Sequence, residues 1–159
     1  MSKIISLPFF IATLALLVSS VSFAQSTAQD NYKKGLEFLT QNSQAEGVQT
    51  TPSGLQYLVL KKGTGSTHPG PTDRVKVHYH GTLINGNVFD SSVDRGQSIS
   101  FGLNRVIKGW TEGLQLMVVG EKTRLFIPSN LAYGKRGAGS LIGPDMTLIF
   151  DVELLGINQ

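Results

Sequence analysis

The amino-acid sequence predicts an α+β fold, in which an antiparallel sheet of five to six strands wraps around one short helix and a second short helix lies near the N-terminus. Three observations lead to this prediction. Eighteen glycines and six prolines in 159 residues indicate many turns, as in a strand-rich protein. Apolar and polar residues alternate with a period of two in several segments, which is typical of half-buried strands. Only one segment between these strands has the apolar spacing of a helix.

Residues 1–24 have the pattern of a secretory signal peptide. Lys3 supplies a positive start, an apolar stretch runs from Leu7 to Val18, and Ser22 and Ala24 form a small-residue cleavage site. A membrane anchor is the alternative interpretation, but the apolar stretch is short for a span of about 20 residues. We therefore expect cleavage after Ala24 and exclude this segment from the fold.

Residues 25–46 are expected to form a short helical extension. Asp30 is a candidate N-cap, preceded by a polar tail, for a helix that ends near Asn42. Gly35 weakens this helix, and a linker over 44–51 follows it. One apolar face is expected to pack on the rest of the protein, and it consists of Tyr32, Leu36 and Leu39.

The main domain is expected over 47–159, with strands separated by turns rich in glycine and proline. The predicted strands lie at 55–59, 75–79, 98–101, 122–128 and 147–155. Asn85-Gly86 predicts a tight hairpin turn, and a helix is expected near 107–116. The segment 129–144 is glycine-rich and irregular, and loops of this length inside compact domains are usually functional.

The residue types present make several kinds of chemistry unexpected. The chain has no cysteine and three histidines, and it lacks the common nucleotide-binding, zinc-protease and serine-hydrolase motifs. We therefore expect no cofactor and no metal. The formal charge of +3 is small and the lysines and arginines are dispersed, so nucleic-acid binding is not expected either. Asp90 and Asp94 lie close in sequence, but nothing else supports a two-carboxylate hydrolase.

Aromatic residues near glycines are the remaining feature that suggests a site. They are Tyr79, Phe89, Phe101, Trp110, Tyr133 and Phe150. These side chains either form the plain core of a small sheet, which we prefer for Phe101, or line a concave apolar site with a few polar groups. In the second interpretation Trp110 forms the floor of the pocket.

Several spaced motifs resemble the FKBP-type peptidyl-prolyl cis/trans isomerases. They occur at 77–83, 86–92, 106–114, 132–134 and 148–154. The resemblance extends from about Gly47 to the C-terminus. The segment Glu46–Tyr57 further resembles the exported bacterial branch of this family, which includes macrophage-infectivity potentiators and FkpA-like proteins.

The resemblance implies the FKBP-like form of the fold and a set of site residues. Asp90, Tyr133 and Ile107 are the expected catalytic residues, with the Ile107 backbone N–H and the Tyr133 hydroxyl binding the peptide. The expected substrate-binding residues are Tyr79, Phe89, Arg95, Ile99, Val106, Trp110, Ile142 and Phe150. Arg95 is the expected partner of Asp90. Ile99 stands where an aromatic is common in the family, and Ala138 where a histidine is often found.

The resemblance also implies partners and a location. The expected function is isomerisation of X–Pro bonds during folding of exported proteins, without a cofactor. The expected partners are proline-containing polypeptides and macrolides such as rapamycin or tacrolimus. A monomer is expected in the periplasm of a Gram-negative bacterium, secreted or outer-membrane-associated forms being the alternatives, with no stable membrane insertion after cleavage. The alternative function is a periplasmic chaperone or surface interaction protein whose isomerase activity is incidental.

Overall fold

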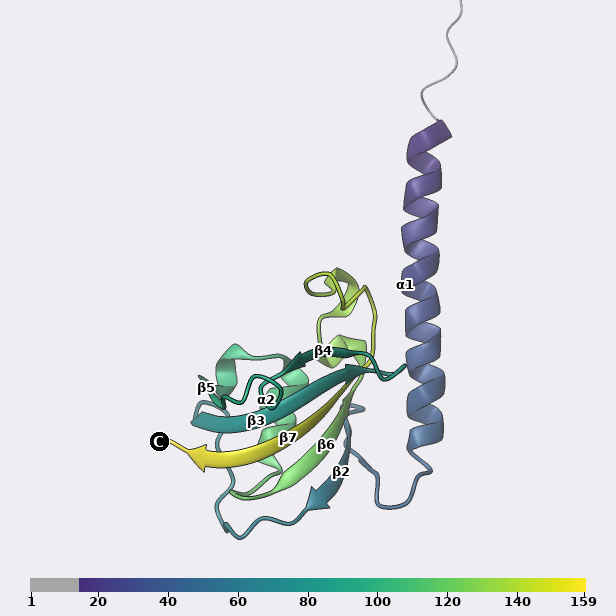
Figure 1. Cartoon of the computed structure of the whole chain (residues 1–159). Helices are drawn as coiled ribbons and strands as arrows, with labels where there is room; N and C mark the ends of the chain where they lie inside the picture. The colour runs from purple at the N-terminus through teal and green to yellow at the C-terminus, as the bar shows by residue number, and fades with distance from the viewer. Residues whose placement is uncertain (1–14) are drawn as a thin grey trace, which may run out of the picture.

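The structure of the protein, a computed structural model, describes residues 15–159, with side chains from residue 27 onward (Figure 1). The start of the predicted signal peptide, residues 1–14, lies outside the described residues. Within residues 15–159 the α-helices are α1 (Ala15–Asn42) and α2 (Lys108–Gln115). The strands are β1 (Gln49–Thr50), β2 (Gln56–Lys61), β3 (Arg74–Leu83), β4 (Val88–Ser91), β5 (Ile99–Gly102), β6 (Lys122–Ile127) and β7 (Leu148–Ile157). Three short 3-10 helices complete the fold: η1 (Leu103–Arg105), η2 (Ser129–Leu131) and η3 (Gly134–Arg136).

All strand pairs are antiparallel and belong to one seven-stranded sheet, which confirms the predicted α+β class. The order is β1-β2-β6-β7-β3-β4, and β5 pairs with the first half of β3 while β4 pairs with the second half. The sheet exceeds the predicted five to six strands because β1, only two residues long, forms inside the predicted linker. The Asn85-Gly86 turn joins β3 to β4 as expected, and Gly86 has a φ of 88°.

Helix α2 packs against β6 at very short range because two glycines face the sheet. A Cβ atom on Gly109 would lie 2.4 Å from Ile127 Cγ2, and one on Gly113 would lie 2.7 Å from Leu125 Cδ1. The core between helix and sheet is formed by alternating residues of the strands, as in β7, where every second residue is buried. This close packing places Trp110 of α2 in the hollow of the sheet.

Helix α1 begins at Ala15, so the predicted N-cap at Asp30 and the polar tail before it are wrong. Residues 25–29 contain no proline or glycine. Once residues 31–42 are docked on the domain, the helix can therefore continue from Asp30 toward the N-terminus, because extending an existing helix is favourable. Figure 1 shows α1 standing beside the sheet and extending past it. No described helix combines the length and the hydrophobicity needed to cross a membrane.

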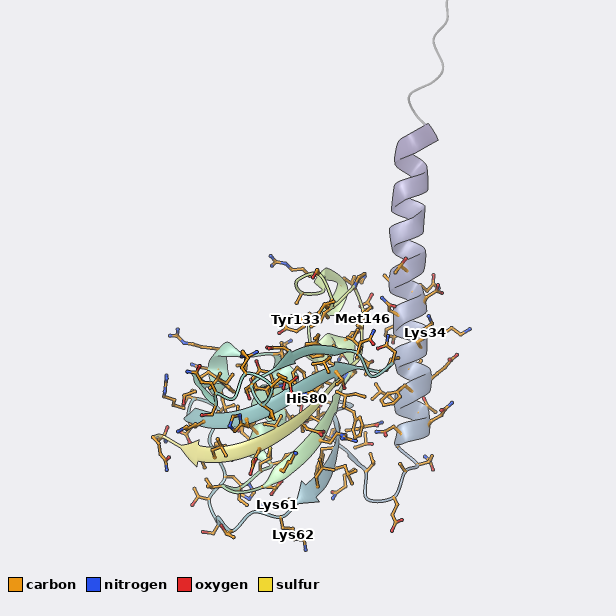
Figure 2. The ribbon with its side chains drawn as sticks, viewed as in Figure 1. Lys34, Lys61, Lys62, His80, Tyr133 and Met146 are labelled. Atoms are coloured by element: carbon orange, nitrogen blue, oxygen red, sulfur yellow. The ribbon has the colours of Figure 1, made fainter. Side chains whose placement is uncertain are left out.

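The face of α1 that packs on the domain differs from the predicted one. Tyr32 and Leu36 are 56% and 54% exposed, and only Leu39 of the predicted face is buried. The docked face consists of Asn31, Gly35, Phe38, Leu39 and Asn42, whose contacts lie on β2, β6 and the loop that leads into β7. Lys34 points away from the sheet (Figure 2). The face combines polar, glycine and apolar residues because its contacts are hydrogen bonds, a close backbone approach at Gly35 and the packing of Phe38 on Phe126.

Candidate active site

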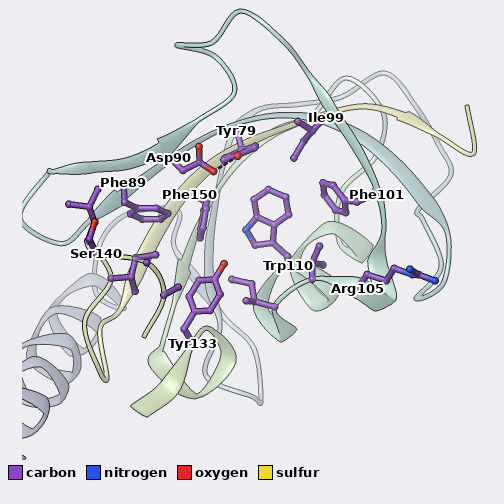
Figure 3. Close-up of a pocket in the computed structure, with 16 residues that line it drawn as sticks. Tyr79, Phe89, Asp90, Ile99, Phe101, Arg105, Trp110, Tyr133, Ser140 and Phe150 are labelled. Carbon is purple, nitrogen blue, oxygen red and sulfur yellow. Dashed lines mark hydrogen bonds between the residues drawn. The ribbon is translucent and has the colours of Figure 1, made fainter. Parts of the chain in front are cut away.

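A cavity of about 720 Å³ opens between α2, the concave side of the sheet and the loop that follows β6 (Figure 3). Its lining is mostly apolar and aromatic. It includes every residue predicted to catalyse or to bind substrate except Arg95: Tyr79, Phe89, Asp90, Ile99, Val106, Ile107, Trp110, Tyr133, Ile142 and Phe150. Residues from four strands, helix α2 and two loops therefore line one cavity.

Trp110 forms the floor of the cavity. Its side chain is 5% exposed, and its ring meets Tyr79 and Phe150 edge-on, with centroids 5.3 and 5.2 Å apart. Phe89 in turn meets Phe150 at 5.2 Å. Edge-to-face pairs of this kind hold each ring in one orientation and stabilise the cluster. The aromatic walls are thus packed against one another.

A hydrogen-bonded group of three polar residues, which we call the rim triad, closes one side of the cavity. It consists of Tyr79, Asp90 and Arg95. The Tyr79 hydroxyl donates to one carboxylate oxygen of Asp90, and Arg95 donates to the other. Arg95 also donates to the Tyr79 hydroxyl at 3.0 Å. Arg95 does not line the cavity, so its contact with the site runs through Tyr79 and Asp90.

The rim triad keeps Asp90 ionised and Tyr79 protonated. Burial alone raises the pKa of Asp90, but hydrogen bonds from Tyr79 and Arg95, together with the Arg95 charge, outweigh burial and leave this pKa below its ordinary value. Burial and the hydrogen bond to Asp90 raise the pKa of Tyr79. The hydrogen bonds to Tyr79 and Asp90 raise the pKa of Arg95. The rim therefore presents a fixed carboxylate and a fixed guanidinium.

A β-bulge places Phe89 and Asp90 on the same cavity. Gly81 pairs with Asp90, and the next residue, Thr82, pairs with Val88, so Phe89 is an extra residue in β4. In a regular strand two neighbours point to opposite faces, whereas a bulge re-aims one of them. Gly81 leaves room for the Phe89 ring, because a Cβ atom there would lie 2.7 Å from that ring.

Hydrogen bonds of two serines connect the end of β4 to β3 beside the rim triad. Ser92 Oγ accepts the backbone N–H of Tyr79 at 2.8 Å and lies 3.0 Å from His78 Nδ1. Ser91 Oγ lies 2.9 Å from His80 Nδ1. The histidines were predicted to be exposed, but both are half-buried because they bond to these serines. They hold the Asp90 segment in place and do not line the cavity.

Three polar groups at the cavity have no hydrogen-bond partner among the described residues. They are the Ile107 backbone N–H, the Tyr133 hydroxyl and the buried indole Nε1 of Trp110. Ile107 is the N-cap of α2, and the first turns of a helix leave N–H groups free. Figure 3 shows the Tyr133 hydroxyl pointing into the cavity. The Ile107 N–H and the Tyr133 hydroxyl are available to a bound peptide, whereas the Trp110 Nε1 is enclosed by protein.

The loop after β6 forms a miniature hairpin that supplies the last wall. Ala138 and Ile142 exchange backbone hydrogen bonds of 2.8 and 3.2 Å. Gly137 has a φ of 64°, and a Cβ atom on it would lie 2.3 Å from the Ile142 carbonyl oxygen. A glycine is required there for both reasons, and the turn brings Ile142 to the cavity.

Some lining residues were not predicted. Phe101 was assigned to the plain core, yet it lines the cavity with its ring 5.3 Å from Trp110. Phe101 lies two residues after Ile99 in β5, so the two side chains share one face of the strand. Because Ile99 was predicted to bind substrate, this spacing could have placed Phe101 at the cavity. Arg105 also lines the cavity, and no local pattern indicated it. Ala138 to Leu141 line it as well; they belong to the loop over 129–144 that was expected to be functional, although only Ile142 of that stretch was named as a substrate-binding residue.

The chain matches the family profile described as "FKBP-type peptidyl-prolyl cis-trans isomerase" over residues 65–155. Residues 15–59 match the profile described as "Domain amino terminal to FKBP-type peptidyl-prolyl isomerase". The aromatic cavity and these matches agree, and the chain belongs to the FKBP-type peptidyl-prolyl cis-trans isomerase family.

Several known proteins are similar to this chain. The FKBP-type peptidyl-prolyl cis-trans isomerase FkpA of Aeromonas hydrophila is 58% identical over 136 residues, which are 86% of this chain and 50% of the relative. The FKBP-type 22 kDa isomerase of Escherichia coli is 55% identical over 78% of this chain and 60% of the relative. The crystal structure of FkpA from Escherichia coli superposes with a TM-score of 0.85 at 44% identity, over 90% of this chain and 66% of that one. The chain thus spans 50% and 60% of the length of these two curated relatives.

Proposed function

We propose that the protein accelerates cis/trans isomerisation of X–Pro bonds in polypeptides. The observation that carries the proposal is the aromatic cavity, whose lining includes two unpaired donors, the Ile107 backbone N–H and the Tyr133 hydroxyl. An X–Pro bond isomerises slowly because amide resonance must be broken, with a barrier of about 20 kcal/mol. The twisted transition state loses charge separation, so an apolar cavity stabilises it relative to the dipolar ground state that water prefers.

Each group of the site has a role in this mechanism. The proline ring occupies the aromatic walls above Trp110. The Ile107 N–H and the Tyr133 hydroxyl hold the peptide backbone in a bent conformation, close to the twisted geometry. Asp90, kept ionised by Tyr79 and Arg95, sets the electrostatic field at the rim. None of these roles requires a nucleophile or proton transfer.

The test is isomerisation of X–Pro peptides by the wild-type protein and by Trp110→Leu. We expect acceleration by the wild type, and a large loss in a folded Trp110→Leu variant because the floor is reshaped. Inhibition by rapamycin or tacrolimus is expected, since we propose that both occupy the same cavity. Absence of acceleration for every peptide would refute the proposal. Proline-limited refolding with the same pair separates catalysis from chaperone activity, which would survive in Trp110→Leu.

We further propose that the protein acts on exported polypeptides as a monomer in the periplasm of a Gram-negative bacterium. The support is the signal-peptide pattern of residues 1–24. Cleavage after Ala24 removes the first part of α1 and keeps every docked residue of that helix, so the domain at 47–159 retains its extension at 25–46. We expect the exported protein to have the intact mass of a chain that begins at Gln25. A mass that retains the leader would instead indicate an anchored protein.

A further inference from the structure

A second cavity of about 470 Å³ adjoins the aromatic one. It is lined by Tyr133, Arg136, Gly137, Ala138 and Gly139. Tyr133, Ala138 and Gly139 line both cavities, so the two share a wall. The second cavity therefore borders the cavity in which we place the proline.

Arg136 is the one charged residue in the lining of this second cavity. It is exposed, and it forms no ion pair or side-chain hydrogen bond within residues 27–159. Arg95 and Arg124, by contrast, are each paired with an aspartate. The neighbouring Lys135 adds a second positive charge on η3. The positive charge of this subsite is thus available to a ligand.

The lining of the second cavity also favours an extended polypeptide. Gly137 and Gly139 have positive φ values of 64° and 57°, and a Cβ atom on Gly139 would meet nothing within 4 Å. At Gly139 the lining is therefore bare backbone with space above it, whereas Gly137 is packed against the Ile142 carbonyl oxygen. Arginine binds carboxylates through a planar fork of donors.

We infer that the second cavity is a specificity subsite that takes an aspartate or glutamate side chain lying one or two residues from the proline. The inference rests on the proposed isomerase function. An extended chain advances about 3.3 Å per residue, so a residue this close to the proline reaches the shared wall of Tyr133, Ala138 and Gly139. Acidic proline-containing segments are then the preferred substrates.

The experiment uses X–Pro peptides that carry a single glutamate, or glutamine in its place, at each of the two positions on either side of the proline. Isomerisation gives kcat/KM, and fluorescence of Trp110, the single tryptophan of the chain, gives affinity independently of catalysis. We expect a preference of about two- to fivefold for glutamate at one position, the usual size for an exposed ion pair. Salt should weaken this preference.

Two variants assign the preference to Arg136. In Arg136→Gln the glutamate and glutamine peptides should become equal, and in Arg136→Glu a lysine peptide should be preferred. Lys135→Gln is the matched control, because it removes the same charge from the same turn but does not line the cavity. Melting curves check that each variant is folded.

The outcomes are distinguishable. Equal kcat/KM and equal affinity for all wild-type pairs would overturn the inference, as would an equal loss of preference in Lys135→Gln and Arg136→Gln. If no peptide is isomerised, the proposed function fails, while the fluorescence titration still decides whether the subsite prefers an acidic side chain.

Discussion

At the scale of single residues, the carboxylate of Asp90 joins two neighbours, since it accepts hydrogen bonds from both Tyr79 and Arg95. The same carboxylate lines the cavity. Asp90 can therefore have either of two roles. It stabilises the turn after β4, or its charge acts on the twisted imide of the substrate. They differ in whether stability and activity change together.

We expect Asp90→Asn to lower the isomerisation rate roughly tenfold while the protein stays folded. A tenfold loss corresponds to about 1.4 kcal/mol of activation free energy, which we assign to the effect of the carboxylate charge on the twisted imide. Peptide isomerisation and a melting curve on the same samples provide the measurement. Asp94→Asn is the control, because Asp94 lies near His80 and does not line the cavity. Wild-type rates in a folded Asp90→Asn protein would move the catalytic role to Tyr133 and the apolar walls.

The same residue predicts an acid dependence of stability. The pKa of Asp90 is lower in the folded protein than in the unfolded chain. Its contribution is therefore fully present above the unfolded pKa of about 3.9 and is lost as the pH falls through the folded pKa. Urea unfolding from neutral pH to about pH 3 should show a steeper acid loss in the wild type than in Asp90→Asn. Parallel curves for the two proteins would contradict this expectation.

At the scale of elements, α1 is held on the domain by close contacts at Gly35 and by polar bonds above and below it. Asn31 donates to the Pro144 carbonyl oxygen at 2.9 Å, and Asn42 donates to Gln56 at 2.8 Å. A Cβ atom on Gly35 would lie 2.3 Å from Thr147 Oγ1. The glycine that weakens the isolated helix is thus the residue that lets it dock.

We expect Gly35→Ala to destabilise the protein by about 1–2 kcal/mol, the usual cost of overpacking. Helix propensity alone predicts the opposite, a gain of about 0.5–1 kcal/mol. Denaturant unfolding of the single variant and of Gly35→Ala with Thr147→Ala separates the two effects. The double variant should recover stability, because the clashing hydroxyl is removed. An unchanged or higher stability for the single variant would show that α1 is not docked as described.

At the scale of the whole molecule, the exposed part of α1 bears on association. Tyr32 and Leu36 are the large apolar side chains that α1 exposes between residues 27 and 42. Two side chains form a much smaller surface than a stable interface requires, which is about 800 Å² for each partner.

We therefore expect the mature protein to sediment as a monomer at micromolar concentration. Truncation of residues 25–46 should leave this sedimentation behaviour unchanged, and Tyr32→Ser with Leu36→Ser should do the same. A dimer that is lost on either change would overturn the prediction and identify the Tyr32/Leu36 face as the interface. The helix is longer in the structure than the sequence predicted, which makes this measurement informative.

Much of the fold and the cavity follows from local patterns in the chain. Period-two alternation predicted β2, β3, β5, β6 and β7, because a half-buried strand must alternate wherever it pairs. The Asn-Gly turn and the spacing of α2 are also local. The family resemblance then identified eleven site residues. Ten of them line the cavity in the structure, and the eleventh, Arg95, forms an ion pair with Asp90.

The features that the sequence did not predict depend on which distant segments lie opposite one another. Patterns within a few residues of the chain do not specify these pairings. The bulge that turns both Phe89 and Asp90 toward the cavity exists because Gly81 stands across from it in β3. Phe101 reaches the cavity because β5 pairs with the first half of β3, and Gly35 faces the domain because Thr147 lies against it. Alternation and turn chemistry act over a few residues, so the sequence by itself determined the elements. Register and close backbone approach arise only between distant segments, so the tertiary structure decided how those elements build the site.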